Sequence, residues 1–491
     1  MVGQVRPGLD AGWGPPIVFQ RLFLPLLMAQ SMEGDRTRPN ANPRPRNRTW
    51  IVRSGRGLAV AVAFAMVVVL TLAGSIAILS SGWTTALLDP IQGDPQAQLA
   101  VASGSGSELY VAYAGIAEGP SGRVFALKLS SNVGGKWSST LVDWSLRPRY
   151  GLSFYDPSVA VDPAGHVYLA FGFDNGTYGL NTRYGTNAGG AWAFMTIHSN
   201  QYESSPAIAV DSRGLIHMIF YWSRYSTCYC VHLEYATNPE GAWTNSTVLN
   251  VPDTMVGRAG LALDSQGNAI IGIARSIEAG GVAILTNAEG VWRTQTLGDL
   301  AEPGKEGMAI AVDAGDHIHL VYPVLVPDGS GNATGRLHYA TNAQGAWSIT
   351  ELPWETDRYT TVSLMLDSAN RAHIAFSDRD GGLVYAAGAP GNWIATSLPS
   401  AHPGGWANSG TAVAVPGPGS RVHILFTQSR NYPEPSGLFD VSNGVDSTNV
   451  DAFWAQALPV LYLEGAIFVG AGIGMAILPR AVARRRSGAA R

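Results

Sequence analysis

Arginine, tyrosine and carboxylate side chains gather in four short polar segments of the chain. These segments contain Arg149, Tyr155 and Asp156, then Tyr202 and Glu203, then Arg258, and finally Asp357, Arg358 and Tyr359. Arginine binds carboxylates through paired, charge-assisted hydrogen bonds, and a tyrosine beside a carboxylate can act as a nucleophile. If the fold brings the segments together, they form a candidate catalytic site for an anionic substrate.

The same segments also support a simpler interpretation, in which they bind a ligand without chemistry. Tyr155, Tyr202, Tyr359 and Trp406 offer aromatic faces beside carboxylates and amides. Such faces stack on sugar rings or hold peptides. Ordinary packing of these rings is an equally simple explanation.

Cys228, Cys230 and His232 form the segment CYCVH, in which the three side chains alternate along the chain. In a strand they would share one face. They could bind a soft metal ion, or the two cysteines could form a tight disulfide; two unreactive thiols in a hairpin are the alternative. We find no cofactor motif and expect no cofactor.

A repeat of about 50 residues organises the elements that must position these residues. Its first half recurs five times around the module aspartates Asp162, Asp211, Asp264, Asp313 and Asp367, and looser copies at 97–113 and 411–426 bring the number to seven. Its second half is a turn containing Asn and Gly that leads into a tryptophan: Trp137, Trp192, Trp243, Trp292, Trp347 and Trp393. Each half reads as two alternating apolar stretches joined by a turn, which indicates a β-hairpin.

Two hairpins per repeat make four antiparallel strands, which is one blade of a propeller. The sequence therefore predicts an all-β, seven-bladed β-propeller over residues 81–444. The seventh tryptophan is Trp83, which stands far ahead of the last module, whose own end, GLFDVSNG, has no strand led by Trp. We expect residues 83–88 to complete that blade and close the ring. The repeated Trp residues, and His217, His319 and His373, are expected to pack within the blades.

Two apolar segments flank the predicted propeller. Residues 57–80 and 457–479 each contain a run long enough to cross a bilayer as a helix, although Glu464 interrupts the second run. A signal peptide and a soluble amphipathic helix are the respective alternatives. Gly470 and Gly474 provide a small-residue pattern that allows membrane helices to pair.

Charge predicts the topology of the chain. The tails, residues 1–56 and 480–491, contain 14 of the 32 basic residues and 3 of the 36 acidic ones. Because basic residues accumulate on the cytoplasmic side, both termini are expected in the cytoplasm, with the propeller and the 445–456 linker outside. The intervening chain keeps 18 basic and 33 acidic residues, so nucleic acid is not expected as a partner.

The turn T-N-x-x-G-x-W resembles the Asp-box turn of sialidase-like β-propellers, whose pattern is Ser-x-Asp-x-Gly-x-Thr-Trp. Asn187, Asn238, Asn287 and Asn342 stand where that family has Asp. The resemblance implies the propeller fold, with these turns away from the central site. Sialidases hold the substrate carboxylate with three arginines, use a Tyr nucleophile activated by Glu, and have an acidic proton donor. If the resemblance extends to this site, the corresponding residues here would be Arg149, Arg258, Arg358, Tyr359, Glu203 and Asp156. The early Phe-Arg-Ile-Pro segment of that family is missing.

Three functions remain open on sequence alone. The first is a surface-displayed propeller that binds a carbohydrate or protein ligand without catalysis. The second is a membrane-anchored exo-glycosidase of sialidase type. The third is a structural subunit of a cell-envelope complex, suggested by the glycine pattern and by Glu464.

Overall fold

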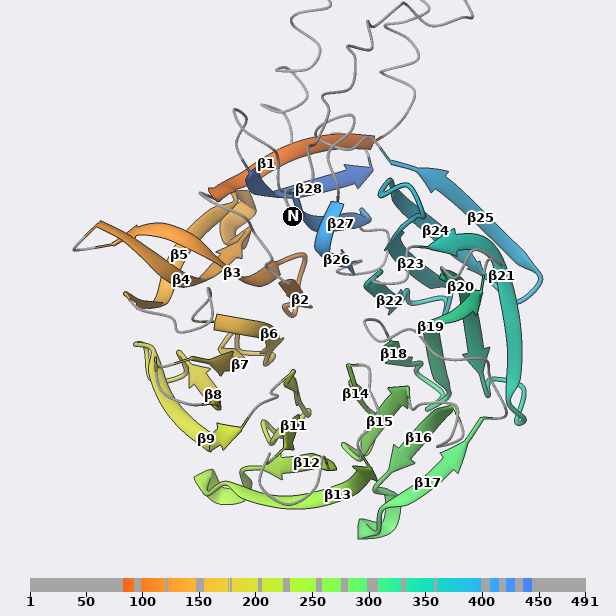
Figure 1. Cartoon of the computed structure of the whole chain (residues 1–491), viewed down its shortest axis with the longest axis horizontal. Coiled ribbons are helices and arrows are strands. Elements are labelled where there is room, and N and C mark those ends of the chain that lie inside the picture. The colour runs from red at the N-terminus through yellow and green to blue at the C-terminus, as the bar shows by residue number, and fades with distance from the viewer. Residues whose placement is uncertain are drawn as a thin grey trace, which may run out of the picture. The chain divides into compact units, whose positions relative to one another are not determined.

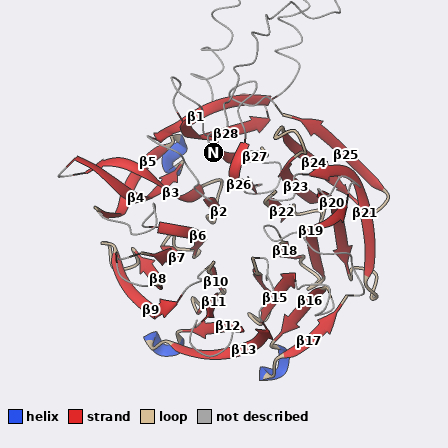
Figure 2. Cartoon of the chain, viewed as in Figure 1, coloured by secondary structure: helices blue, strands red, loops and turns tan. Residues whose placement is uncertain are grey.

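The described part of the chain is a ring of seven four-stranded antiparallel sheets (Figure 1). The computed structural model describes residues 83–91, 99–119, 122–146, 154–174, 176, 179–201, 205–223, 230–252, 258–274, 281–297, 308–327, 333–356, 360–398, 407–414, 421–428 and 436–443. Strands make up almost all of its regular structure, and short 3-10 turns such as η2 (Val133–Gly135) and η5 (Ala288–Gly290) complete it (Figure 2). The predicted all-β, seven-bladed propeller is confirmed.

Each blade is a four-stranded meander that begins at the centre of the ring. Blade 1 consists of β2 (Leu99–Ser103), β3 (Leu109–Gly119), β4 (Gly122–Ser131) and β5 (Ser138–Ser145). Blade 2 consists of β6 (Phe154–Val161), β7 (Val167–Phe173), β8 (Leu180–Thr186) and β9 (Ala193–Gln201). Blade 3 consists of β10 (Ala207–Val210), β11 (Ile216–Ser223), β12 (Cys230–Thr237) and β13 (Thr244–Pro252). Blade 4 consists of β14 (Gly260–Leu263), β15 (Ala269–Ala274), β16 (Val282–Thr286) and β17 (Arg293–Thr296). Blade 5 consists of β18 (Ala309–Val312), β19 (Ile318–Pro327), β20 (Ala333–Thr341) and β21 (Ser348–Thr356). Blade 6 consists of β22 (Val362–Leu366), β23 (Ala372–Ser377), β24 (Leu383–Ala389) and β25 (Asn392–Ser397).

Blade 7 is assembled from both ends of the propeller. Its inner strands are β26 (Ala407–Ala414), β27 (His423–Gln428) and β28 (Ser436–Asn443), and its outer strand is β1 (Trp83–Ile91). β1 lies antiparallel to β28 with Trp83 opposite Asn443, and Figure 1 shows β1 as the outer strand of this blade. The first strand therefore closes the ring by pairing with the last.

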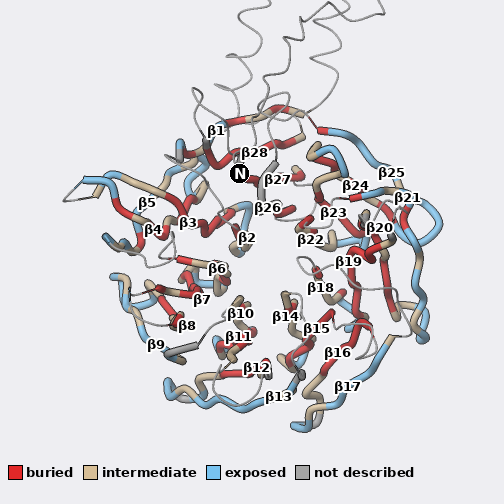
Figure 3. The backbone as a smooth tube through the Cα atoms, in the orientation of Figure 1, coloured by how far each residue is buried: buried red, intermediate tan, exposed pale blue. Residues whose placement is uncertain are grey.

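Apolar side chains fill the seven spaces between neighbouring blades. Within the described residues, one buried cluster lies in each space, and the partly buried tryptophan of the following blade packs against it: Trp137, Trp192, Trp243, Trp292, Trp347, Trp393 and Trp83. Trp83 packs on Tyr385 of blade 6, with ring centroids 5.1 Å apart. The burial decreases outward, because the outermost strands of the blades face solvent (Figure 3).

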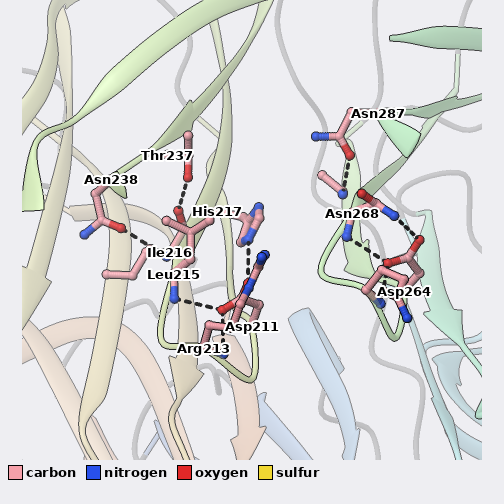
Figure 4. Close-up of polar contacts among 12 residues, drawn as sticks. Asp211, Arg213, Leu215, Ile216, His217, Thr237, Asn238, Asp264, Asn268 and Asn287 are labelled. Carbon is pink, nitrogen blue, oxygen red and sulfur yellow. Dashed lines mark hydrogen bonds and ion pairs between the residues drawn. The ribbon is translucent and has the colours of Figure 1, made fainter. Parts of the chain in front are cut away.

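Two kinds of side chain hold the turns of most blades. In the turn between the first and second strands, a module aspartate accepts two backbone hydrogen bonds, as Asp211 does from Arg213 and Leu215 at 2.9 and 2.8 Å (Figure 4). In the turn between the third and fourth strands, an asparagine reaches across to the second strand, as Asn238 accepts from the Ile216 amide at 3.0 Å. These bonds satisfy backbone N–H groups that the strand ladders leave unpaired.

No helix within the described residues has the length and apolar character needed to cross a membrane. The two segments predicted as membrane helices, 57–80 and 457–479, lie outside the described residues, as do both basic tails and the 445–456 linker.

Replacing the tryptophan of the closing strand should weaken the whole ring. We expect Trp83→Ala to lower the free energy of unfolding by about 3 kcal/mol, because it leaves a cavity against Tyr385. Trp144, which is 39% exposed on β5, provides the control, and Trp144→Ala should change stability by less than about 0.5 kcal/mol. Urea unfolding of both variants measures the difference, and equal losses would contradict the closing role of Trp83.

The asparagine turn can be tested with one variant that truncates the side chain and one that keeps its shape. Asn342 Oδ1 accepts the Ile318 amide at 2.7 Å. Asn342→Ala leaves that N–H without its acceptor and should cost about 1–3 kcal/mol in urea unfolding. Asn342→Asp keeps the acceptor, as in an Asp-box, and should retain most of the stability. An equal loss in both variants would show that the amide NH₂, rather than the oxygen, matters.

Candidate functional site

The innermost strands of the blades enclose a central channel. It has a cavity of about 240 Å³ and takes its walls from β2, β6, β10, β14, β18, β22 and β26. Its lining includes Leu99, Leu261, Ile310 and Leu364, whose side chains pack with the clusters between the blades. A polar cluster lies at the mouth, where the first strands start.

Three residues from consecutive blades form this mouth cluster: Asp156, Ser205 and Arg258. The Arg258 guanidinium lies 3.1 Å from Asp156 Oδ1, and the Ser205 hydroxyl donates to Asp156 Oδ2 at 2.7 Å. Each residue stands six positions before the module aspartate of its blade, so the repeat itself brings them to equivalent places. The cluster thus links blades 2, 3 and 4 across the channel mouth.

The backbone at the mouth is held in an unusual conformation. Asp156 has φ of 48° and Ser205 has φ of 37°, both in the left-handed region that non-glycine residues rarely adopt. The register of β6 against β7 also shifts between Tyr155 and Ser158, which forms a bulge at Asp156. Bulges and left-handed residues re-aim side chains and are concentrated at functional sites. Here they direct Asp156 toward Ser205 and Arg258.

The mouth cluster is charge-balanced and remains accessible. The side chains of Arg258 and Asp156 are 27% and 19% exposed. Asp156 compensates the positive charge of Arg258, and among the described residues the pair and Ser205 use only part of the five N–H donors of the guanidinium and the lone pairs of the carboxylate. The arrangement can therefore donate and accept hydrogen bonds at once without presenting a net charge.

The structure brings two of the predicted catalytic residues together. Arg258 and Asp156 meet as an ion pair, and Tyr155 lies beside them in β6, opposite Gly172 of β7. The remaining candidates lie outside the described residues: Arg149, Tyr202, Glu203, Arg358, Tyr359 and Trp406. Ser205 was not predicted, although its position six residues before Asp211 matches that of Asp156 before Asp162.

The CYCVH segment lies in blade 3. Cys230 and His232 belong to β12, and Cys228 lies outside the described residues. The His232 ring stacks on Trp222 at 4.2 Å, and its Nδ1 is 2.5 Å from Asn250 Oδ1. Within the described part of the chain, no group of three His, Cys, Asp or Glu side chains could hold a metal ion.

Rows of Asp, His and Tyr recur in three blades and resemble catalytic triads. In blade 5 the His319 ring shares a hydrogen bond with the Tyr339 hydroxyl at 2.5 Å, and its Nε2 lies 3.4 Å from Asp313 Oδ2. His217 and His373 each share a hydrogen bond with a tyrosine hydroxyl at 2.7 Å in blades 3 and 6; His373 Nε2 lies 3.2 Å from Asp367 Oδ2, whereas His217 Nε2 lies 3.9 Å from Asp211 Oδ2. All three histidines are buried within their blades. Their burial and repetition indicate a structural row that joins the inner turn to the third strand.

The histidine rows make stability depend on pH. Burial lowers the pKa of His319 below its ordinary value, against the opposing attraction of Asp313, and His217 and His373 shift in the same direction. Since the unfolded chain then binds protons more readily, stability should decrease as the pH falls below about 6.5.

We expect His319→Gln to reduce this pH dependence. The urea midpoint of the unmodified protein should fall between pH 7.5 and 5.5 by more than that of the variant, because one buried proton-binding group is gone. Ile270 occupies the equivalent position in blade 4, so His319→Ile is a second variant that the blade geometry accommodates. Identical pH profiles for all three proteins would contradict this assignment.

Comparisons with known proteins found similar solved structures but no match to a sequence family. No protein-family model matches the chain, and no curated protein matches its sequence. Similar solved structures include a polysaccharide lyase described as an ulvan lyase, which is 11% identical with a TM-score of 0.47, over 72% of this chain and 93% of that one. An alpha-L-arabinanase of Penicillium chrysogenum complexed with arabinobiose is 11% identical with a TM-score of 0.45, over 73% and 97%. A Hadza microbial sialidase is 11% identical with a TM-score of 0.40, over 72% and 65%.

Similarity at this level concerns the arrangement of blades and carries no information about substrate or activity. The chain is a seven-bladed β-propeller, and a sialidase is among the solved structures to which it is similar.

Proposed function

We propose that the propeller binds a neutral, hydroxyl-rich ligand, a saccharide, at the mouth of its channel without catalysing a reaction. The observation that carries this proposal is the pairing of Arg258 with Asp156, with Ser205 on the other carboxylate oxygen. Sugar hydroxyls both donate and accept hydrogen bonds, so they match a site that offers guanidinium donors and carboxylate acceptors side by side.

The charge balance favours a neutral ligand over an anionic one. A substrate carboxylate would have to compete with Asp156 for Arg258, and it would approach a second negative charge at close range. A sialidase-type mechanism would instead need Arg258 to hold the substrate and an acid free to donate a proton. In the described structure these two candidates bind each other.

The size of the channel limits what can enter it. Its cavity of about 240 Å³ is smaller than the roughly 300–1,000 Å³ of pockets that hold drug-sized ligands. This size suits the terminal unit of a longer saccharide, with its hydroxyls at the mouth cluster.

We further propose that the propeller is displayed at the cell surface by two membrane helices, with both termini in the cytoplasm. The support is the apolar runs within 57–80 and 457–479 and the basic tails beyond them. Pairing of the two helices through Gly470 and Gly474 would fit the closure of blade 7 by β1 and β28.

Glycan binding by the full-length protein, measured in detergent or lipid nanodiscs, tests the function. We expect binding of neutral glycans in preference to sialylated or uronic-acid glycans. Asp156→Asn should weaken neutral binding roughly 10- to 100-fold and shift preference toward anionic glycans, because Arg258 loses its counter-charge. The matched control is Asp143→Asn, which disrupts another Asp–Arg pair, with Arg183 at 2.9 Å, away from the channel lining.

Three results would overturn the proposal. Release of sialic acid by the wild-type protein would support the glycosidase alternative. Equal effects of Asp156→Asn and Asp143→Asn would remove the mouth cluster from the binding site. An absence of glycan binding would leave the protein-ligand and structural-subunit alternatives.

A further inference from the structure

The chain enters and leaves the propeller at one face of the ring. In blade 1, Ser131 and Ser138 are paired on either side of the turn between the third and fourth strands. In blade 7, Ser442 and Thr84 form the equivalent pair, followed by Asn443 opposite Trp83. Asn443 also accepts the Val422 amide at 2.8 Å, as Asn132 accepts that of Leu109 in blade 1. The two chain ends therefore replace the last turn of blade 7.

We call this side the turn face, because it carries the turns between strands one and two and between strands three and four of each blade. The mouth cluster lies on the opposite side. Asp156, Ser205 and Arg258 stand at the beginnings of first strands, and each first strand ends at its module aspartate on the turn face. The mouth of the channel and the chain ends are thus on opposite faces of the ring.

The tether between the first apolar run and the propeller is short. Leu79 ends the uncharged run 58–79, and only Ser80, Ser81 and Gly82 separate it from Trp83. Four extended residues span at most about 14 Å. β1 then runs nine residues toward the mouth face, a length of about 30 Å. If residues 58–79 cross the bilayer, the Trp83 end of β1 must lie close to the lipid headgroups, and its Ile91 end has no such restriction.

Of the two sets of turns on the turn face, those between third and fourth strands have a composition that suits such a position, whereas those between first and second strands carry the module aspartates and charged residues such as Arg213 and Arg371. The six turns between third and fourth strands read NVGGK, NAGGA, NPEGA, NAEGV, NAQGA and GAPGN, and they contain three charged residues among many small ones. Val133 and Val291 are 53% and 60% exposed at two of these turns. Few charges would lose water if these turns approached a headgroup layer, so the approach carries a low desolvation penalty.

We infer that the turn face rests on the phospholipid surface and that the channel mouth points away from the membrane. This inference rests on the membrane anchorage included in the proposed function. It assigns a lipid partner to the six turns and leaves the mouth cluster accessible to ligands from outside the cell.

Fluorescent reporters at the two ends of one strand test the orientation. In full-length protein with Cys228→Ser and Cys230→Ser, reconstituted in phosphatidylcholine vesicles, a single cysteine is introduced as Val133→Cys at the turn face or as Arg123→Cys at the mouth face. Both positions are exposed, and β4 separates them by about 25–30 Å. A bimane label on each is then exposed to phosphatidylcholine that carries a nitroxide on its headgroup.

We expect the Val133 label to be quenched at least threefold more than the Arg123 label. Three outcomes would overturn the orientation while leaving the anchorage intact, provided that the protein resists alkaline carbonate extraction. They are stronger quenching at position 123, equal quenching at both positions, and no quenching at either. Extraction of the protein by carbonate would overturn the anchorage itself, and the orientation with it.

Discussion

Ring closure depends on the pairing of β1 with β28, the two strands that are farthest apart in the described sequence. Without β1, blade 7 would have three strands and an exposed edge, and the space beside blade 6 would lose Trp83. An open edge invites pairing with other chains, and closure removes it. The channel exists only because the blades complete a circle, so the mouth cluster depends on the same pairing.

Inside that circle, the repeat acts mainly through hydrogen bonds from side chains to the backbone. The module aspartates and the turn asparagines bind the same backbone positions in blade after blade. This explains why Asn can stand where an Asp-box has Asp, since both provide the acceptor oxygen that the turn requires. It also explains why the recurring residues hold the fold and leave function to positions that vary between blades.

The sequence predicted the parts of the structure that repeat. Blade number, hairpin turns and the displaced strand at Trp83 could be recognised because each residue type recurs at a fixed place in a module. Asp156 and Arg258 were recognised as candidates by type alone, whereas their mutual contact was not. Ser205 was missed because a lone serine carries no chemical signal until it is aligned with Asp156 and Arg258 at the same module position. The bulge and the left-handed backbone at Asp156 leave no periodic trace in the sequence either.

The tryptophans do not hold all blades equally. In four spaces the tryptophan of one blade meets the tyrosine of the preceding third strand at about 5 Å, as Trp243 does with Tyr184 and Trp292 with Tyr235. These contacts join blades 2, 3 and 4 into one arc and blades 5, 6 and 7 into another. In the remaining three spaces the third strand carries Leu129, Ile284 or Asp440 at that position. Small opening motions of the ring should therefore occur mainly on the two sides of blade 1 and between blades 4 and 5. The mouth cluster lies within the arc of blades 2 to 4 and should move together with that arc.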